Sequence, residues 1–251
     1  MYEAAPPDLY AGKTAHARSF GHVVARVLEL LPDVPMLNGI MGVGVVDDGA
    51  ELEHLAQALD WMRSFGIGGY IAVVPGSNAE RVLREERQLE PGYAWMKFSF
   101  DLIEGEPPEG AADLRVVAVG PDQATAFGTA FAEGYGMPPS VIGFGATVVG
   151  RPGWHCYVAF DGDEPAAAAA LFADGDVAWL GMAGTRPAFR RRGAQNALLA
   201  ARLQRARSLE CKLAFTETGE RLPDRPSNSY RNILRAGFQE RYLRPNLVIP
   251  G

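Results

Sequence analysis

The feature that most constrains the fold is a change of hydrophobic periodicity between residues 154 and 208. Three apolar segments come first, separated by short turns rich in Asp and Gly: 154–160, 165–172 and 177–183. Apolar residues then recur at positions i, i+3, i+4 and i+7 over 194–208. The first pattern is typical of antiparallel strands joined by tight turns, and the second of an amphipathic helix. We therefore expect a three-stranded meander followed directly by a long helix.

An arginine-rich turn, Arg190-Arg191-Arg192-Gly193-Ala194-Gln195, lies between the third of these strands and the helix. A strand that turns through a glycine into a helix directs bare backbone N–H groups and the positive end of the helix dipole into the turn. This geometry favours a bound phosphate. Arginine side chains add charge-assisted hydrogen bonds to phosphate oxygens. The alternative is a solvated arginine-rich loop in which Gly193 only makes the turn.

Charge is distributed unevenly along the chain, although the net charge is only −6. Residues 1–112 carry 8 basic and 17 acidic residues, a net of −9, whereas residues 113–251 carry 16 and 13, a net of +3. The stretch 186–244 holds 14 basic and 5 acidic residues, a net of +9. Such a cationic segment in an acidic protein favours an anionic ligand. Nucleic acid is not favoured as that ligand, because aromatic residues are not interleaved with the arginines.

Composition and missing patterns exclude several classes of protein. The chain is 47% hydrophobic and 22% charged, the ordinary mixture of a globular protein. It has two cysteines and no Cys/His cluster with zinc-ligand spacing, so we expect no metal and a cytoplasmic location. No apolar run reaches the roughly 18 residues that span a bilayer, and the first residues lack a signal-peptide pattern. We therefore expect neither secretion nor a membrane partner.

The segment 104–112 is rich in Pro, Gly and acidic residues and has no periodicity, which predicts a domain boundary and hence domains 1–112 and 113–251. In the first domain, helices are predicted at 17–31, 51–65 and 78–89, and strands at 36–46, 70–74 and 94–102. In the second, a strand at 115–119 and a helix at 122–133 precede the meander. The alternation of strands and helices predicts an α/β fold.

The arginine-rich turn resembles the R/Q-x-x-G-x-G/A signature of the GNAT superfamily of acyl-CoA-dependent N-acyltransferases. Other segments are similar to family elements in the right order: Thr185-Arg186-Pro187 to the end of the fourth strand, 212–216 to the fifth strand, 228–236 to the fourth helix, and Gly237-Phe238 to the start of the sixth strand. The resemblance implies the α/β (α+β) class, with a GNAT-like mixed central sheet flanked by helices, in two tandem domains. Residues 1–112 resemble a degenerate copy without the phosphate loop; the alternative is an unrelated α/β extension.

The resemblance also implies a cofactor, acetyl-CoA, whose pyrophosphate and 3′-phosphate would account for the cationic segment. Backbone groups of Ala183, Gly184 and Thr185 would then hold the pantetheine arm and polarise the thioester. Arg190 and the backbone amides of the rest of the turn would bind the pyrophosphate: Arg191, Arg192, Gly193, Ala194 and Gln195. Asn228 would contact the cofactor or cap the helix that it begins. The signature departs from the family at Gln195, where Gly or Ala is usual.

Three residues are candidates for proton transfer. Glu217 is the first choice for the general base, because it follows an apolar strand beside the cleft that the resemblance implies; the alternative is a solvated loop glutamate. His155 has a suitable intrinsic pKa, although a lone histidine on a strand is more often structural. Many family members have a tyrosine acid where this chain has Ile233, and Tyr230 lies about one helical turn earlier. Both cysteines, Trp154 and Trp179 are predicted to belong to the core.

The predicted function is transfer of the acetyl group of acetyl-CoA directly to a primary amine of a small molecule or peptide. The alternative is a non-catalytic acyl-CoA-binding or regulatory module. The Gly/Pro-rich stretch 134–148 is predicted to form an acceptor-side loop, and a homodimer is compatible with the sequence.

Overall fold

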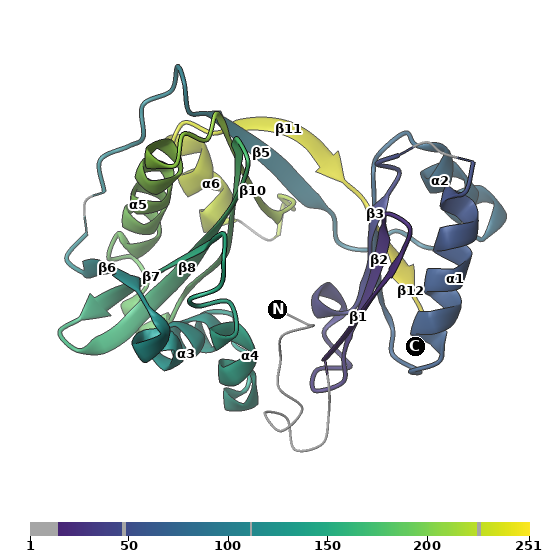
Figure 1. Ribbon diagram of the computed structural model, residues 1–251, viewed down its shortest axis with the longest axis horizontal. Helices are drawn as coiled ribbons and strands as arrows, with labels where there is room; N and C mark the ends of the chain where they lie inside the picture. Colours follow the sequence, from purple (N-terminus) through teal and green to yellow (C-terminus); the bar gives the residue numbers. More distant parts are fainter. Residues whose placement is uncertain (1–14, 47–48, 111, 225–226) are drawn as a thin grey trace. The chain divides into compact units, whose positions relative to one another are not determined.

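The computed structural model describes residues 15–46, 49–110, 112–224 and 227–251 (Figure 1). The chain divides into two compact units, which we describe separately. The larger unit is Met96–Tyr242, and the smaller unit consists of the described residues up to Trp95 together with Leu243–Gly251. Both units combine a sheet with helices, which confirms the predicted α/β class.

The larger unit is built on a seven-stranded sheet with the order β11-β5-β10-β9-β8-β7-β6. Its strands are β5 (Trp95–Asp101), β6 (Arg115–Val119), β7 (Trp154–Asp161), β8 (Glu164–Asp174), β9 (Val177–Thr185), β10 (Leu213–Gly219) and β11 (Gln239–Arg244). The pairs β6–β7, β7–β8 and β8–β9 are antiparallel, which confirms the predicted meander of β7, β8 and β9. The pair β9–β10 is parallel. The sheet is therefore mixed.

Helices cover both faces of this sheet (Figure 1). They are α3 (Ala124–Gly134), α4 (Ile142–Ala146), α5 (Ala194–Ser208) and α6 (Asn228–Arg235), with short 3-10 turns at Pro121–Gln123, Pro139–Val141 and Pro187–Phe189. Helix α5 has the predicted bounds, and Leu199 and Leu203 of α5 pack with α6 over a core that includes Phe98. The acceptor-side loop predicted at 134–148 is instead largely helical, because Val141 and Phe144 are fully buried and hold the segment on the domain.

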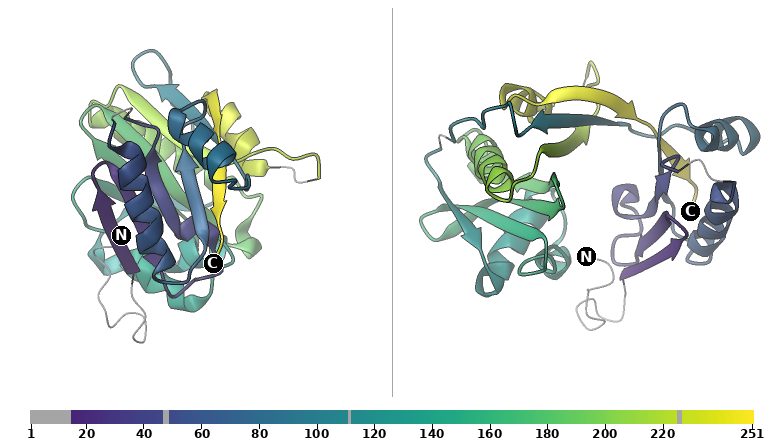
Figure 2. Two further views of the ribbon diagram at one scale, coloured as in Figure 1. Left: turned by 90° about the vertical axis from the view of Figure 1, so that its right-hand side faces the viewer. Right: turned by 45° about the horizontal axis from the view of Figure 1, so that its top comes forward.

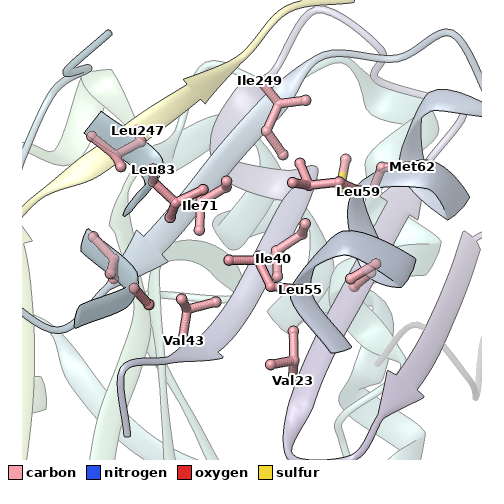
Figure 3. Close-up of a cluster of buried hydrophobic side chains, with 14 of the residues drawn as sticks. Val23, Ile40, Val43, Leu55, Leu59, Met62, Ile71, Leu83, Leu247 and Ile249 are labelled. Atoms are coloured by element: carbon pink, nitrogen blue, oxygen red, sulfur yellow. The ribbon is translucent and has the colours of Figure 1, made fainter. Parts of the chain in front are cut away.

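The smaller unit has a five-stranded sheet with the order β1-β2-β3-β4-β12. Its elements are β1 (Ala15–Phe20), β2 (Val23–Leu28), a 3-10 turn (Pro35–Leu37), β3 (Gly39–Val43), α1 (Glu51–Arg63), β4 (Gly69–Val73), α2 (Asn78–Arg81), a π-helical turn (Val82–Glu86) and β12 (Asn246–Ile249). Figure 2 shows α1 lying along one face of this sheet. Leu55, Leu59 and Met62 of α1 pack there against Ile40 and Ile71 of the strands (Figure 3).

One helix prediction in the smaller unit is wrong. Residues 17–31 form the end of β1, a turn and β2 rather than a helix. Gly21 makes the turn with a φ of +57°, a conformation that glycine adopts without steric cost. The β-branched residues Val23 and Val27 are buried on one side of β2 while Val24 is 36% exposed on the other, and this alternation stabilises a strand.

The division of the chain also differs from the predicted boundary at residue 112. Strand β5 lies within the larger sheet, between β10 and β11, although its residues were predicted to belong to the N-terminal domain. Strand β12, near the C-terminus, pairs instead with β4 in the smaller sheet. Gly110, in the predicted linker, lies against Ala197 and Ala200 of α5. Hydrogen bonding between strands therefore sets the division, and the Pro/Gly-rich segment is only a connection within the larger unit.

Candidate active site

Strands β9 and β10 part at one end, which creates an opening in the larger sheet. Their parallel pairing runs from Val177 and Leu213 to Leu180 and Thr216. Both strands continue past the last pair, β9 through 181–185 and β10 through 217–219. The backbone groups of these continuations therefore face one another across the opening, where a ligand can hydrogen-bond to them.

A β-bulge lies in β9 at this opening. Gly181 pairs with Ala170 and Gly184 with Ala168, so two residues of β9, Met182 and Ala183, stand opposite one residue of β8. Met182 has a φ of +50°, which is unusual for a residue with a side chain. Bulges of this kind change the direction of the following backbone groups.

A buried arginine from α5 braces the bulge. Arg202 is only 1% exposed, and its Nη1 donates hydrogen bonds to the carbonyl oxygens of Ala170 (3.1 Å) and Gly181 (3.3 Å). Its Nε donates to the carbonyl of Leu198 at 2.9 Å. Burial lowers the pKa of Arg202 to about 10, so the guanidinium stays charged at neutral pH. A full positive charge is thus fixed beside the bulge.

Glu217 is the first residue of β10 beyond the last pair. Its carboxylate Oε2 accepts a hydrogen bond from the Lys97 ammonium on β5, and both side chains are 21% exposed. The side chain therefore stands at the opening in a defined position, still accessible to a small molecule. The role of Glu217 as the general base stays a prediction.

Tyr135 enters the same region directly after the C-terminus of α3. Gly134 brings the helix end so close to β9 that a Cβ atom there would lie 2.7 Å from the carbonyl carbon of Gly184. Burial of the hydroxyl raises the pKa of Tyr135 to about 12; nearby Glu217 acts in the same direction, while Arg202 and a hydrogen bond from the Ala183 amide oppose it. The residue as a whole remains 40% exposed, so its ring borders solvent. A neutral phenol accordingly lies near the bulge and Glu217.

The first turn of α5 carries the geometry of an anion site. Gly193 is the N-cap residue with a φ of +78°, and this turn, which the structure describes in full, has neither a side-chain cap nor an acidic residue. Gln195, the departure from the signature, turns its side chain to Asn232, whose Nδ2 donates to Oε1 at 2.8 Å. The side chain therefore points away from the turn and leaves its backbone accessible. These features fit a bound phosphate group.

The arginines of the turn divide into two groups. Arg190 and Arg191 are exposed. Arg192 instead makes a bidentate ion pair with Asp161, at 2.8 and 3.0 Å. Arg186 binds Glu133 at 2.6 Å and Glu164 at 2.8 Å. The ion pairs of Arg186 and Arg192 thus fix the loop to neighbouring strands and to α3. Arg190 and Arg191 are the arginines whose exposed side chains can contact a ligand.

The structure does not bring the other predicted catalytic residues to the opening. His155 lies on β7, two strands from β9, where its Nδ1 accepts a 3.5 Å hydrogen bond from Arg205; burial and Arg205 lower its pKa. Tyr230 is 4% exposed, and its hydroxyl donates to Glu240 at 2.6 Å. Burial, with help from Glu240, raises the pKa of Tyr230 to about 12. Both residues have structural contacts that account for them.

Asn228 and the cysteines also have structural positions. The N-cap of α6 is Ser227, whose side chain accepts from the Tyr230 amide at 3.1 Å, so the capping role does not belong to Asn228. The Asn228 oxygen accepts a hydrogen bond from Arg231. Cys156 and Cys211 are 3% and 4% exposed, which confirms that they are core residues, and burial raises the pKa of Cys156 to about 12.

A family model matches the part of the larger unit that forms the opening. Residues 125–224, which include α3, the bulge, the arginine-rich turn and β10, match the model of the Acetyltransferase (GNAT) family. This stretch of the larger unit is therefore similar to the GNAT family. No functionally curated protein matches the sequence.

Solved structures share the fold of the whole chain at low sequence identity. A GCN5-related N-acetyltransferase from Kribbella flavida is 20% identical, with a TM-score of 0.61 over 94% of this chain and 90% of that one. One from Sphaerobacter thermophilus is 14% identical, with a TM-score of 0.63 over 90% and 79% of the two chains. A tandem GNAT protein from the clavulanic acid biosynthesis pathway is 14% identical, with a TM-score of 0.62 over 91% and 78%.

Sequence reasoning missed three residues of the larger unit. Arg202 lies four residues after Leu198 and therefore on the buried stripe of α5, where an arginine is not expected. Tyr135 follows a glycine at the end of a predicted helix, and Lys97 lies in a strand predicted to belong elsewhere. Only Arg202 had a signal in its spacing. In the part of the chain that the structure describes, no helix is long and apolar enough to cross a membrane, and no cluster of three His, Cys, Asp or Glu could hold a metal.

Proposed function

We propose that the larger unit transfers the acetyl group of acetyl-CoA to a primary amine on a small molecule or peptide. The GNAT fold indicates acyl-CoA-dependent acyl transfer. The observation that carries the proposal is the parting of β9 and β10, with a bulge on one strand and a carboxylate on the other. Direct transfer needs these two functions, a polarising amide and a proton acceptor, on opposite sides of the reacting carbonyl.

Coenzyme A would lie along β9 with its pyrophosphate at the N-terminus of α5. The uncapped backbone amides after Gly193 and the exposed side chains of Arg190 and Arg191 would bind the phosphate oxygens. Backbone groups of 183–185 would hold the pantetheine arm. The Ala183 amide would polarise the reacting carbonyl in place of its hydrogen bond to the Tyr135 hydroxyl.

Proton transfer would use the two side chains at the opening. As the amine nitrogen forms its bond to the carbonyl carbon, Glu217 would accept a proton from that nitrogen. As the carbon–sulfur bond breaks, the neutral phenol of Tyr135 would donate its proton to the departing sulfur, so that coenzyme A leaves as the thiol, and the phenolate would regain a proton from solvent. Tyr135 would thereby fill the role that the family tyrosine has at the position of Ile233.

The smaller unit would be a degenerate GNAT-like domain that has lost cofactor binding. Its parallel strands β3 and β4 flank α1 as β9 and β10 flank α5. At the start of α1, however, the carboxylate of Glu51 accepts hydrogen bonds from the Gly44 amide at 2.6 Å and from His22 at 3.2 Å. A negative charge therefore lies where a phosphate would need positive charge. Two further acidic residues of the sequence between β3 and α1, Asp47 and Asp48, lie outside the described residues.

Two measurements test the proposed function. Isothermal titration with acetyl-CoA should show one site per chain, and thiol release should require an added amine. Binding without thiol release across a broad amine panel would support the non-catalytic alternative. Absence of acetyl-CoA binding would contradict both functions.

A further inference from the structure

Four aromatic residues form a row across the sheet of the larger unit. Trp154 pairs directly with Phe172, Phe172 with Trp179, and Trp179 with Phe215, on the adjacent strands β7, β8, β9 and β10. The ring centroid of Trp154 lies 5.2 Å from that of Phe172 and 6.1 Å from that of Trp179. None of the four is fully buried, and Phe215 is 38% exposed. The two tryptophans are therefore not core residues, contrary to the sequence-based prediction.

Three of these rings line a cavity of about 420 Å³ that lies wholly within the larger unit. Phe172, Trp179 and Phe215 line it together with Tyr242 of β11, and Glu217 and Lys97 border it. This volume lies in the range of small-molecule sites, which are mostly apolar with a few polar groups. The charged residues of its lining balance, because Lys97 and Arg241 are matched by Glu217 and Asp174. The cavity thus suits an uncharged planar group.

The cavity adjoins the opening between β9 and β10. The indole of Trp179 lies over Gly181, so closely that a Cβ atom on Gly181 would come within 2.0 Å of it. Gly181 directly precedes the bulge, and its carbonyl is held by Arg202. On the neighbouring strand, Phe215 and Glu217 lie two residues apart and thus on one face. The aromatic walls therefore lead to the proposed proton acceptor.

We propose that this cavity binds an aromatic group carried by the acceptor amine, so that the amine reaches Glu217. The inference rests on the proposed function and narrows its substrate class to arylalkylamines. The rings supply apolar contact and stacking for the aryl group. A short alkyl chain would then place the nitrogen at the carboxylate that borders the cavity.

Binding tests the cavity without any need for turnover. The full chain, saturated with coenzyme A, is titrated with 2-phenylethylamine and with ethanolamine, which has no ring. We expect 2-phenylethylamine to bind at least tenfold more tightly, and Phe215→Ala to remove about tenfold of its affinity. Leu234→Ala is the matched control, because Leu234 on α6 is 37% exposed and does not line the cavity. Phe215→Leu, which keeps an apolar side chain, should lose less affinity than Phe215→Ala if both fold.

The thiol assay separates failure of the cavity from failure of the proposed function. In one outcome, acetyl-CoA releases thiol with amines, but the protein binds 2-phenylethylamine no better than ethanolamine, or Phe215→Ala leaves the affinity for 2-phenylethylamine unchanged. This outcome would overturn the proposed aromatic site and leave the proposed acyl transfer standing. If 2-phenylethylamine binds through Phe215 but no amine releases thiol, the cavity is supported and the acyltransferase proposal is overturned.

Discussion

The ammonium of Lys97 binds the carboxylate of Glu217, although the two residues are 120 positions apart in the sequence. Lys97 comes from β5 and Glu217 from β10, and these strands are neighbours in the larger sheet. The ion pair holds the carboxylate where β9 and β10 part. It therefore fixes the orientation of the group that we propose as the proton acceptor.

Glu217→Gln should lower kcat while leaving the affinity for acetyl-CoA almost unchanged. The amide keeps the size of the side chain but cannot accept the proton of the attacking amine, and general bases contribute on the order of 10²- to 10⁴-fold. Steady-state thiol release and calorimetry measure the two quantities. Glu210→Gln, at an exposed position after α5, is the control and should retain full activity. A fully active Glu217→Gln enzyme would remove this residue as the base.

Replacement of Arg190 and Arg191 by Ala should weaken coenzyme A binding, because both side chains are exposed at the turn before α5. Removal of one charge-assisted hydrogen bond to a phosphate oxygen costs about 1.5–3 kcal/mol of binding free energy. The effect should shrink at high salt, where the phosphates are screened. Lys212→Ala, which removes an exposed cation paired with Asp176, serves as the control. An unchanged dissociation constant in the double variant would refute the assignment of the turn.

Arg192→Ala should act differently from its two neighbours. Its guanidinium already pairs with Asp161, and this ion pair lowers the pKa of that carboxyl and raises the pKa of Arg192. We therefore expect faster hydrogen exchange confined to the loop region, with at most a modest change in global stability, and only a small decrease in coenzyme A affinity. Asp161→Asn should reproduce the exchange phenotype. Equal decreases of affinity in Arg191→Ala and Arg192→Ala would contradict this division.

Arg202→Leu should destabilise the protein and lower kcat. It removes the hydrogen bonds from the charged guanidinium to the carbonyls of Ala170 and Gly181, and a hydrogen bond to a charged group contributes about 1.5–3 kcal/mol. Removal of the brace should also relax the bulge at Met182 and misplace the Ala183 amide. Denaturant unfolding and thiol release measure both effects, with Arg205→Leu as a control on the same helix. Wild-type stability and rate in Arg202→Leu would show that the bulge does not depend on this side chain.

Burial of the Tyr230 hydroxyl, together with its hydrogen bond to Glu240, should make stability fall at alkaline pH. The folded-state pKa of Tyr230 is about 12, whereas its ordinary value is 10.0, so the folded chain holds the phenol proton more tightly. The resulting stabilisation is complete below the lower value and disappears as pH rises through the higher one. The unfolding free energy should therefore decline across this window, and less steeply in Tyr230→Phe. Identical slopes in the two proteins would contradict a raised pKa.

Local sequence patterns predicted the strands and helices whose bounds are set by their own residues and adjacent turns. The meander and helix α5 have matching hydrophobic periodicity, turn residues and length, so their bounds follow closely from the sequence. Residues 17–31 were predicted wrongly because their apolar residues fit helical and alternating patterns alike, and the turn at Gly21 decides between them. Short apolar runs do not distinguish the two cases by periodicity alone.

The parts that sequence reasoning missed depend on contacts between distant segments. Strand β5 joins the larger sheet by pairing with β10 and β11, which lie far along the chain. A local sequence pattern cannot predict such a pairing. The brace of Arg202 on the bulge and the position of Tyr135 beside Gly184 arise in the same way. The cofactor turn, in contrast, is a continuous strand–glycine–helix segment, so its position could be identified from the sequence.

Release of free thiol from acetyl-CoA, measured with and without a primary amine, tests the central claim most directly. Mass spectrometry identifies the acylated amine in the same reaction. We expect thiol release only when an amine is present, one N-acetyl product for each thiol, and loss of both in Glu217→Gln with acetyl-CoA still bound. A wild-type protein that neither binds acetyl-CoA nor releases thiol with any amine would contradict this claim.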